Sequence, residues 1–296
     1  MMRDDFADLE APQQKKKTQP RKLRIFIITL LIAGAALSPS VYLHFKAGGS
    51  LNPVDLYQFV FASGNEIKRA KQWMQKGEWS KARDTMQYYY TMEPENPNYL
   101  ALGAEINYQM GRYQEALNLA QALVKLDPEQ AEGHALVGAC AIHFKNFAEA
   151  RAASQRALEL NSYLALPYIT LGNLYLKGGQ VDRALTFLKQ AGRLDPRNSQ
   201  AWTLLSSAYL KQNELENAML SAQTAIELEP NSPGGHFNLG RVYFQKGDAF
   251  NSVQHMQQAE DLYTARDDRI WTAQARQNKE FMIKYFKLRP EDIVRP

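Results

Sequence analysis

The chain has 296 residues, enough for one large domain or two small ones, and 45% of them are apolar, enough to bury a core. Its 35 basic and 31 acidic residues give a net charge of +4, of which +3 lies in residues 1–24. The remainder is close to neutral and lacks the strongly basic composition typical of nucleic-acid-binding proteins, so no nucleic-acid partner is expected. Cys140 is the only cysteine, which excludes an intrachain disulfide.

The first predicted element is a membrane span. Residues 25–45 read IFIITLLIAGAALSPSVYLHF and contain no Asp, Glu, Lys or Arg. A helix needs about 20 predominantly apolar residues to cross the bilayer core, so this run predicts a single transmembrane helix. Lys22 and Arg24 flank its N-terminal end. By the positive-inside rule, residues 1–24 then form a basic tail in the cytoplasm and everything after Phe45 lies across the membrane.

A cleaved signal peptide is the alternative reading of this run, with a small-residue site at 33–35. The basic tail is long for a signal peptide, and the apolar run continues for ten residues beyond that site. Both features favour an uncleaved anchor. Residues 46–62 follow as a linker and a short helix, which we expect to pack on the next element.

A repeat of 34 residues dominates the rest of the chain. Prolines stand at 94, 128, 196 and 230, each directly after a hydrophobic residue and an acidic residue. Ser162 occupies the place in this series where a fifth proline would be expected. Six windows fit this spacing without a gap: 63–96, 97–130, 131–164, 165–198, 199–232 and 233–266. Internal repetition at such a period indicates stacked supersecondary units.

Aligned columns of the repeat predict two helices in each window. Positions 8 and 20 hold small residues throughout, which permits the two helices to approach closely. Position 15 is Gly or Asn except at Lys145, which suits the left-handed residue that ends a helix; Asn146 is expected to take that role in its window. The prolines stop each second helix. Asn96 and Ser232 are expected to cap the helices that begin at Pro97 and Pro233.

Two stretches carry a family resemblance: YITLGNLYLKGGQVDRALTFLKQAGRLDP from Tyr168 and WTLLSSAYLKQNELENAMLSAQTAIELEP from Trp202. Both resemble the tetratricopeptide-repeat family, and the resemblance covers residues 63–266. It implies an all-α fold, a right-handed α-solenoid of six helical hairpins. Residues 267–296 are expected to form a C-terminal capping helix and tail. A docking or dimerisation face is the alternative for this helix, because it contains several aromatic residues.

No catalytic arrangement emerges from the sequence, and we expect neither enzyme activity nor a cofactor or metal. Cys140 and His143 are three residues apart, but a structural zinc site needs four ligands in paired spacing. Cys140 is therefore expected to be a buried packing residue. No Gly-rich phosphate loop or nucleophile motif is present.

The resemblance implies a concave groove formed by the first helices of successive repeats, mainly at positions 2, 5, 9, 12 and 13. That groove would be apolar in the middle and basic in its C-terminal half, which suits an extended peptide or helix with an acidic element. Alternatively, position 12 packs inward and the lysines are only solvated. The residues expected to bind a partner are Glu105, Tyr108, Ile142, Ile169, Asn173, Lys177, Thr203, Ser207, Lys211, Phe237 and Arg241.

Together these features predict a non-catalytic scaffold or assembly adaptor in the bacterial inner membrane, with periplasmic repeats that serve an envelope machine such as a pilus, a secretion system or cytochrome maturation. Family members that grip chaperone tails pair a Lys at position 5 with an Asn at position 9. Asn173 has Ile169 as its partner in this pattern, so chaperone-tail recognition is not expected. A self-oligomerising membrane scaffold and an organelle import receptor with cytosolic repeats are the alternatives.

Overall fold

The computed structural model describes residues 65–289, apart from the side chains of residues 65, 88 and 90–92. This part of the chain consists of thirteen α-helices and contains no strand. In chain order they are α4 (Asn65–Gln75), α5 (Trp79–Met92), α6 (Pro97–Gln109), α7 (Tyr113–Leu126), α8 (Ala131–His143), α9 (Phe147–Leu160), α10 (Ala165–Lys177), α11 (Val181–Leu194), α12 (Ser199–Lys211), α13 (Leu215–Leu228), α14 (Pro233–Gln245), α15 (Ala249–Ala265) and α16 (Arg269–Phe286).

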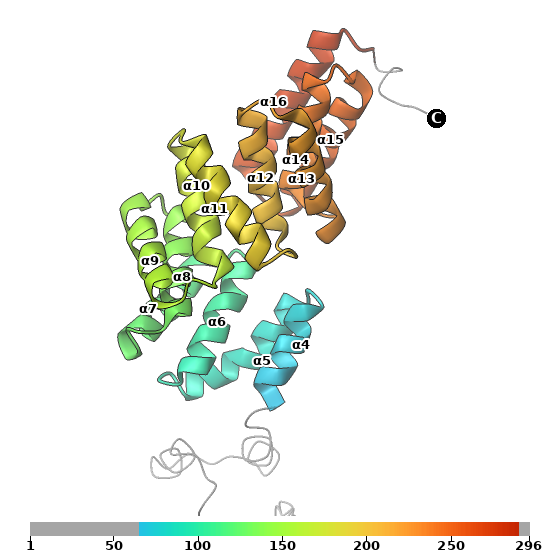
Figure 1. The fold of residues 1–296 in the computed structure, drawn as a ribbon. Coiled ribbons are helices and arrows are strands. Elements are labelled where there is room, and N and C mark those ends of the chain that lie inside the picture. The colour runs from blue at the N-terminus through green and yellow to red at the C-terminus, as the bar shows by residue number, and fades with distance from the viewer. Residues whose placement is uncertain (1–64, 290–296) are drawn as a thin grey trace, which may run out of the picture. The chain divides into compact units, whose positions relative to one another are not determined.

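Successive helices pack as antiparallel pairs. The closest packing within a repeat joins α6 to α7, α8 to α9, α10 to α11, α12 to α13 and α14 to α15, and each pair also packs on the next. The first helices of neighbouring repeats contact one another as well, from α6 with α8 to α12 with α14. Figure 1 shows these pairs following one another along the chain. The predicted all-α solenoid is confirmed for the described residues.

The helix starts follow the 34-residue period. From α6 on, the first helices begin at Pro97, Ala131, Ala165, Ser199 and Pro233. Asn96 accepts a hydrogen bond from the Asn98 backbone N–H, and Ser232 accepts one from that of Gly235. Both predicted caps are confirmed, with proline in the first turn that follows each.

The turn between the two helices of each repeat contains a left-handed residue at position 15. Four of these residues are glycines, and the φ of Gly179 is 74°. Lys145 and Asn213 adopt the same conformation, with φ of 59° and 61°. The expectation that Asn146 would replace Lys145 is wrong: Asn146 instead caps α9 with its side chain and has a φ of −83°. Tertiary packing holds Lys145 in a conformation that its own side chain disfavours.

Small residues sit where the paired helices touch. The alanines at position 20, such as Ala150 and Ala184, are fully buried. At position 8, a methyl group added to Gly172 would lie 2.6 Å from Leu188 Cγ, and one added to Gly138 would lie 2.5 Å from Ser154 Oγ. These contacts leave no room for a larger residue, which is why the repeat requires small ones there.

Ring nitrogens at position 4 of three repeats bind the turn that precedes their helix. Trp202 Nε1 donates to the Pro196 carbonyl at 2.9 Å, and His134 Nε2 lies 2.9 Å from the carbonyl of Pro128. His236 Nε2 lies 3.2 Å from the carbonyl of Pro230 in the same way. The prolines that end each second helix therefore also anchor the start of the next repeat through their carbonyl groups.

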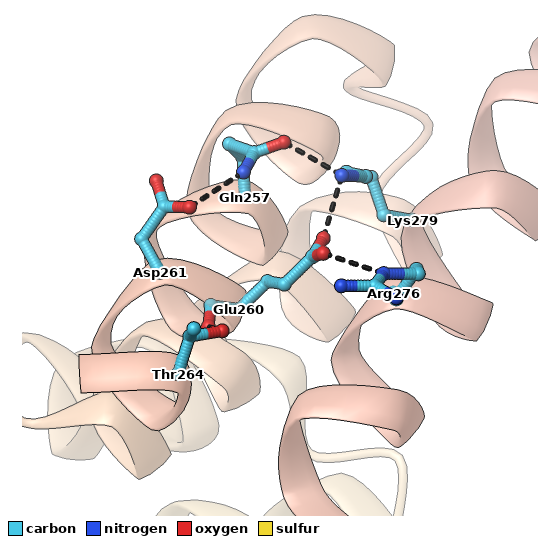
Figure 2. Close-up of polar contacts among 6 residues, drawn as sticks. All are labelled: Gln257, Glu260, Asp261, Thr264, Arg276 and Lys279. Carbon is cyan, nitrogen blue, oxygen red and sulfur yellow. Dashed lines mark hydrogen bonds and ion pairs between the residues drawn. The ribbon is translucent and has the colours of Figure 1, made fainter. Parts of the chain in front are cut away.

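The last helix, α16, packs on α15 and is held there by an ion-pair cluster. Glu260 on α15 is 7% exposed and accepts from Lys279 Nζ at 2.6 Å and from Arg276 Nε at 2.7 Å (Figure 2). Burial alone would raise the pKa of Glu260, but the hydrogen bonds and charges of Lys279 and Arg276 lower it below its ordinary value. A buried carboxylate paired in this way fixes how α16 lies on α15.

Helix α16 also leaves large apolar side chains uncovered. Ile270 is 81% exposed, Phe281 56% and Tyr285 63%. Ala275 and Met282 point the other way, into the core formed with α15. The helix therefore covers the last repeat with one face and leaves these three apolar side chains largely exposed, although the rings of Phe281 and Tyr285 also contact Phe244 of α14.

None of the helices within residues 65–289 is long and apolar enough to cross a bilayer. The predicted transmembrane segment 25–45 lies outside the described residues. So do the predicted tail 1–24 and the linker 46–62.

Candidate functional site

A pocket of about 420 Å³ opens on the side of the repeats formed by their first helices. It draws its walls from α4, α6, α8, α10 and the turn before α12. The lining residues are Ile67, Lys71, Asn98, Ala101, Leu102, Glu105, Tyr108, Gln109, Glu132, Ala135, Leu136, Leu164, Ala165, Leu166, Asp195 and Asn198. A volume of this size falls within the range of about 300–1,000 Å³ that small-molecule sites occupy.

Two of the residues predicted to bind a partner, Glu105 and Tyr108, line this pocket. Tyr108 is 8% exposed, and burial together with the nearby Tyr113 raises its pKa, so it remains a neutral phenol. The Glu105 side chain is exposed to the pocket, while surrounding protein atoms partly desolvate it. That burial raises the pKa of Glu105, and the charge of Lys71 only partly opposes the shift.

The pocket carries an excess of negative charge. Its charged residues are Glu105, Glu132 and Asp195 against Lys71 alone. Asp195 accepts hydrogen bonds from the Arg197 N–H and from Asn198, which hold the turn before α12. Neither Glu105 nor Glu132 forms a hydrogen bond or ion pair through its side chain with any other described residue.

The middle of the predicted groove is more buried than the sequence indicated. Ile142 and Ile169 are 9% and 1% exposed, and each belongs to an apolar core. Position 12 is buried in four successive repeats, which supports the alternative that this column packs inward. Its members there are Tyr108, Ile142, Leu176 and Leu210.

Several predicted residues near the C-terminal end of the groove contact neighbouring helices. The buried Asn238 donates to Ser207 Oγ at 2.9 Å and to the Thr203 carbonyl at 2.8 Å, so these hydrogen bonds join α12 to α14. Phe237 is 7% exposed and lies edge-to-face with Trp271 of α16, 5.5 Å between ring centroids. Little of the Phe237 ring is left for a partner.

Three predicted cations stay accessible. Lys177 and Lys211 are exposed at the C-terminal ends of α10 and α12, and Arg241 is half-buried on α14. Burial lowers the pKa of Arg241, as expected for a cation partly removed from water. No hydrogen bond or ion pair joins these three side chains to another residue of 65–289. Asn173 is half-buried on α10.

The charge of Lys177 also affects the pKa of the nearby His143. The His143 ring stacks on Tyr113 with 3.4 Å between centroids. Burial, followed by the charge of Lys177, lowers the pKa of His143 to about 4. His143 is therefore neutral at pH 7 and adds no charge to the groove.

The pocket includes residues that the sequence reading did not select. Ile67 and Lys71 occupy positions 5 and 9 of the first window, and Glu132 occupies position 2 of the third, so the columns themselves could have indicated them. Asp195 and Asn198 belong to the turn between repeats, outside the columns considered. They join the pocket only because α12 is stacked beside the preceding helices.

Within residues 65–289, no three His, Cys, Asp or Glu side chains are grouped to hold a metal ion. Cys140 is fully buried in the core, as predicted, and burial raises the pKa of its thiol to about 12. A thiol held protonated in this way is a poor nucleophile.

Comparisons with known proteins agree with this architecture. Models described as tetratricopeptide repeat match residues 102–165 and 141–208, and one described as TPR repeat matches residues 206–247. Together they span residues 102–247 and support the tetratricopeptide-repeat family. No curated protein matches the chain.

Solved structures give the same fold at low sequence identity. A chain of the APC/C hetero-tetramer Cut9–Hcn1 is 17% identical, with a TM-score of 0.58 over 71% of this chain and 42% of that one. A chain of the human IFIT1 dimer with PPP-AAAA is 18% identical, with a TM-score of 0.54 over 71% of this chain and 54% of that one. The present chain thus spans less than two thirds of either structure, and the likeness concerns the fold alone.

Proposed function

Because the repeats of residues 102–247 match the tetratricopeptide-repeat family, we propose that this chain is a non-catalytic scaffold that binds a protein partner along its first helices. The observation that carries the proposal is the set of accessible, unpaired cations Lys177, Lys211 and Arg241. A half-buried guanidinium without a counter-charge is costly, and an acidic group on a bound peptide or helix would relieve that cost.

We further propose that residues 25–45 anchor the protein in a bacterial inner membrane and that the repeats lie in the periplasm. The supporting feature is the uncharged run of the sequence together with the basic residues before it. In this setting the repeats would serve as an assembly adaptor for an envelope complex, such as a pilus, a secretion system or the cytochrome maturation machinery.

Crosslinking in the native membrane tests the binding surface. A photo-crosslinking amino acid in place of Asn173 should trap a partner, and the triple variant Lys177→Glu/Lys211→Glu/Arg241→Glu should abolish the adduct. A matched control, Lys125→Glu/Arg193→Glu/Lys284→Glu, makes the same charge change on exposed cations elsewhere and should retain it. An adduct that persists in the first variant would show that these cations are not the site.

Topology is a separate measurement. Protease added to intact spheroplasts should digest the repeats and leave the N-terminal tail protected, and the mature protein should begin before residue 25. Repeats that are protected until the membrane is opened would favour an import receptor or another protein with cytosolic repeats. A mature N-terminus near Ala36 would show that the run is a cleaved signal peptide.

Self-assembly is a second candidate function, favoured by the exposed Ile270, Phe281 and Tyr285 of α16. Phe281 and Tyr285 are one turn apart with their rings in contact, and grouped exposed apolar residues mark an interaction surface more often than scattered single ones. Light scattering of the full chain in detergent should then give a dimer or larger species, and Phe281→Ser/Tyr285→Ser should give a monomer. A monomeric wild-type chain would exclude this candidate.

A further inference from the structure

The pocket between α4, α6, α8, α10 and the turn before α12 combines an apolar floor with acidic walls. Leu102, Leu136 and Leu166 contribute aliphatic surface, whereas Glu105 and Glu132 contribute carboxylates without a hydrogen-bond partner among the described residues. Such a pocket is neither a purely apolar anchor site nor a solvated acidic surface. Its chemistry matches a side chain that has an apolar stem and a cationic end.

The charged side chains that line the pocket are mostly acidic. Three carboxylates and one ammonium line the pocket, so its full charges sum to −2. The N-termini of α6, α8, α10 and α12 also border the pocket, and each helix end acts as roughly half a positive charge that falls off beyond the first turn and is screened by salt. Those dipoles act mainly on Glu132, which lies in the first turn of α8. Glu105 lies two turns into α6, beyond the first turn of its own helix.

Resting on the proposed function, we propose that this pocket receives the arginine or lysine side chain of an extended segment of the protein partner. The aliphatic stem would lie on the leucine floor, and the cationic end would reach Glu105 and Glu132. Hydrogen bonds between ionised groups are about twice as strong as neutral ones, and arginine can engage carboxylates with two parallel bonds. The site therefore favours arginine over lysine.

The position of the acidic pocket relative to the three cations also predicts the orientation in which a partner segment binds. Acidic residues line the pocket in repeats two to four, whereas Lys177, Lys211 and Arg241 carry positive charge in repeats four to six. A partner segment with a basic residue followed or preceded by an acidic element would match both regions in one orientation only. Reversing it would place like charges together, which is unfavourable for binding.

Defined peptides test the pocket on the full-length chain in detergent. We would measure fluorescence anisotropy with three labelled peptides, Gly-Ser-Ala-Leu-X-Ala-Leu-Ser-Gly, in which X is arginine, norleucine or glutamate. The arginine peptide should bind about tenfold more tightly than the norleucine peptide, the difference expected for one charge-assisted interaction. The glutamate peptide should bind more weakly than either.

Two sets of variants keep the result independent of folding. Glu105→Gln/Glu132→Gln should remove the preference for arginine while leaving norleucine binding unchanged. Lys71→Gln should instead strengthen arginine binding by several fold, a gain that a misfolded protein cannot produce. The control Glu227→Gln/Glu280→Gln neutralises two exposed acids elsewhere and should keep the wild-type preference.

Each other outcome overturns the assignment. Equal affinities for arginine and norleucine, or no binding of any peptide, would show that the pocket does not select a cation. Preference for the glutamate peptide would show that the helix N-termini dominate. A fourth labelled peptide, QKKKTQPRKLRI, has the sequence of residues 14–25 of this chain and is measured in the same assay. Much tighter binding of this peptide than of the arginine peptide, lost in Glu105→Gln/Glu132→Gln, would identify the chain's own basic tail as the occupant instead of a partner.

Failure here is distinguishable from failure of the proposed function. If partner crosslinking at Asn173 depends on Lys177, Lys211 and Arg241 but survives Glu105→Gln/Glu132→Gln, the scaffold function stands and the basic-residue pocket does not. If neither set of variants affects crosslinking, both proposals fail.

Discussion

Glu260 Oε2 and Lys279 Nζ lie 2.6 Å apart across the contact between α15 and α16, and Glu260 Oε1 accepts a second bond from Arg276 at 2.7 Å (Figure 2). The glutamate side chain is 9% exposed, that of Lys279 18% and that of Arg276 57%. Removing one partner of a buried pair leaves the other charge uncompensated, which is more damaging than losing a surface ion pair.

Glu260→Ala should therefore lower the free energy of unfolding by about 1–3 kcal/mol, less than for a fully buried pair because Arg276 can turn to water. Urea denaturation measures the loss, and amide hydrogen exchange should show α16 opening first. Glu280→Gln, on the exposed side of the same helix, is the control and should change stability by less than about 0.5 kcal/mol. Equal protection of α16 from hydrogen exchange in the wild-type, Glu260→Ala and Glu280→Gln chains would contradict the role of the Glu260–Lys279 pair.

The pair of His236 and His255 predicts a loss of stability in acid. Their Nδ1 atoms lie 3.1 Å apart, and His255 stacks on Tyr243. Burial lowers the pKa of both rings, and in His255 the charge of His236 adds to the effect and brings the value to about 4. Below about pH 6.5 the unfolded chain thus binds more protons than the folded one, so the free energy of unfolding falls with pH until about pH 4.

His255→Phe keeps a ring on Tyr243 but removes the titrating group. Between pH 7 and pH 5 this variant should lose about 1–2 kcal/mol less stability than the wild-type chain does. Denaturant unfolding at the two pH values measures the difference. Identical pH dependence in the two proteins would mean that this histidine pair does not carry the effect.

Lys145 offers a stabilising substitution. Its φ of 59° lies in the left-handed region, where a side chain costs about 1 kcal/mol relative to glycine. Lys145→Gly should raise the free energy of unfolding by up to about 1 kcal/mol, and Gly179→Ala, at the same position of the next repeat, should lower it by a similar amount. Thermal unfolding measures whether each substitution stabilises or destabilises the protein. A destabilised Lys145→Gly chain would count against the conformational argument.

Two glycines in paired helices should respond to alanine in opposite directions. At Gly172 the new methyl would lie 2.6 Å from Leu188 Cγ, and Leu188 is fully buried and cannot move aside, so Gly172→Ala should cost about 1–3 kcal/mol. At Gly192, within α11, the nearest side-chain atoms are 3.8 Å away, so Gly192→Ala should stabilise by about 0.5–1 kcal/mol through helix propensity. Chemical denaturation of the two variants is the measurement; two changes of the same sign would refute the packing account.

The helical pairs were predictable because their determinants are local and repeated. Proline, a capping side chain and a left-handed turn residue act within one turn of the chain, and six copies of the pattern compensate for any single departure such as Ser162. Lys145 marks the limit of that reasoning. Its backbone follows the turn that the packed helices impose, even though Asn146 beside it has the more suitable side chain.

By itself, the sequence determined the helix pairs and their period, since both depend on residues close together in the chain. Only the tertiary structure decided which residues of the predicted groove columns remain open. Phe237 is covered by Trp271 of α16, and Ile169 is absorbed into the core, whereas Glu105 and Glu132 stay accessible. Side-chain accessibility depends on neighbours one or more repeats away, and no periodicity within a single repeat contains that information.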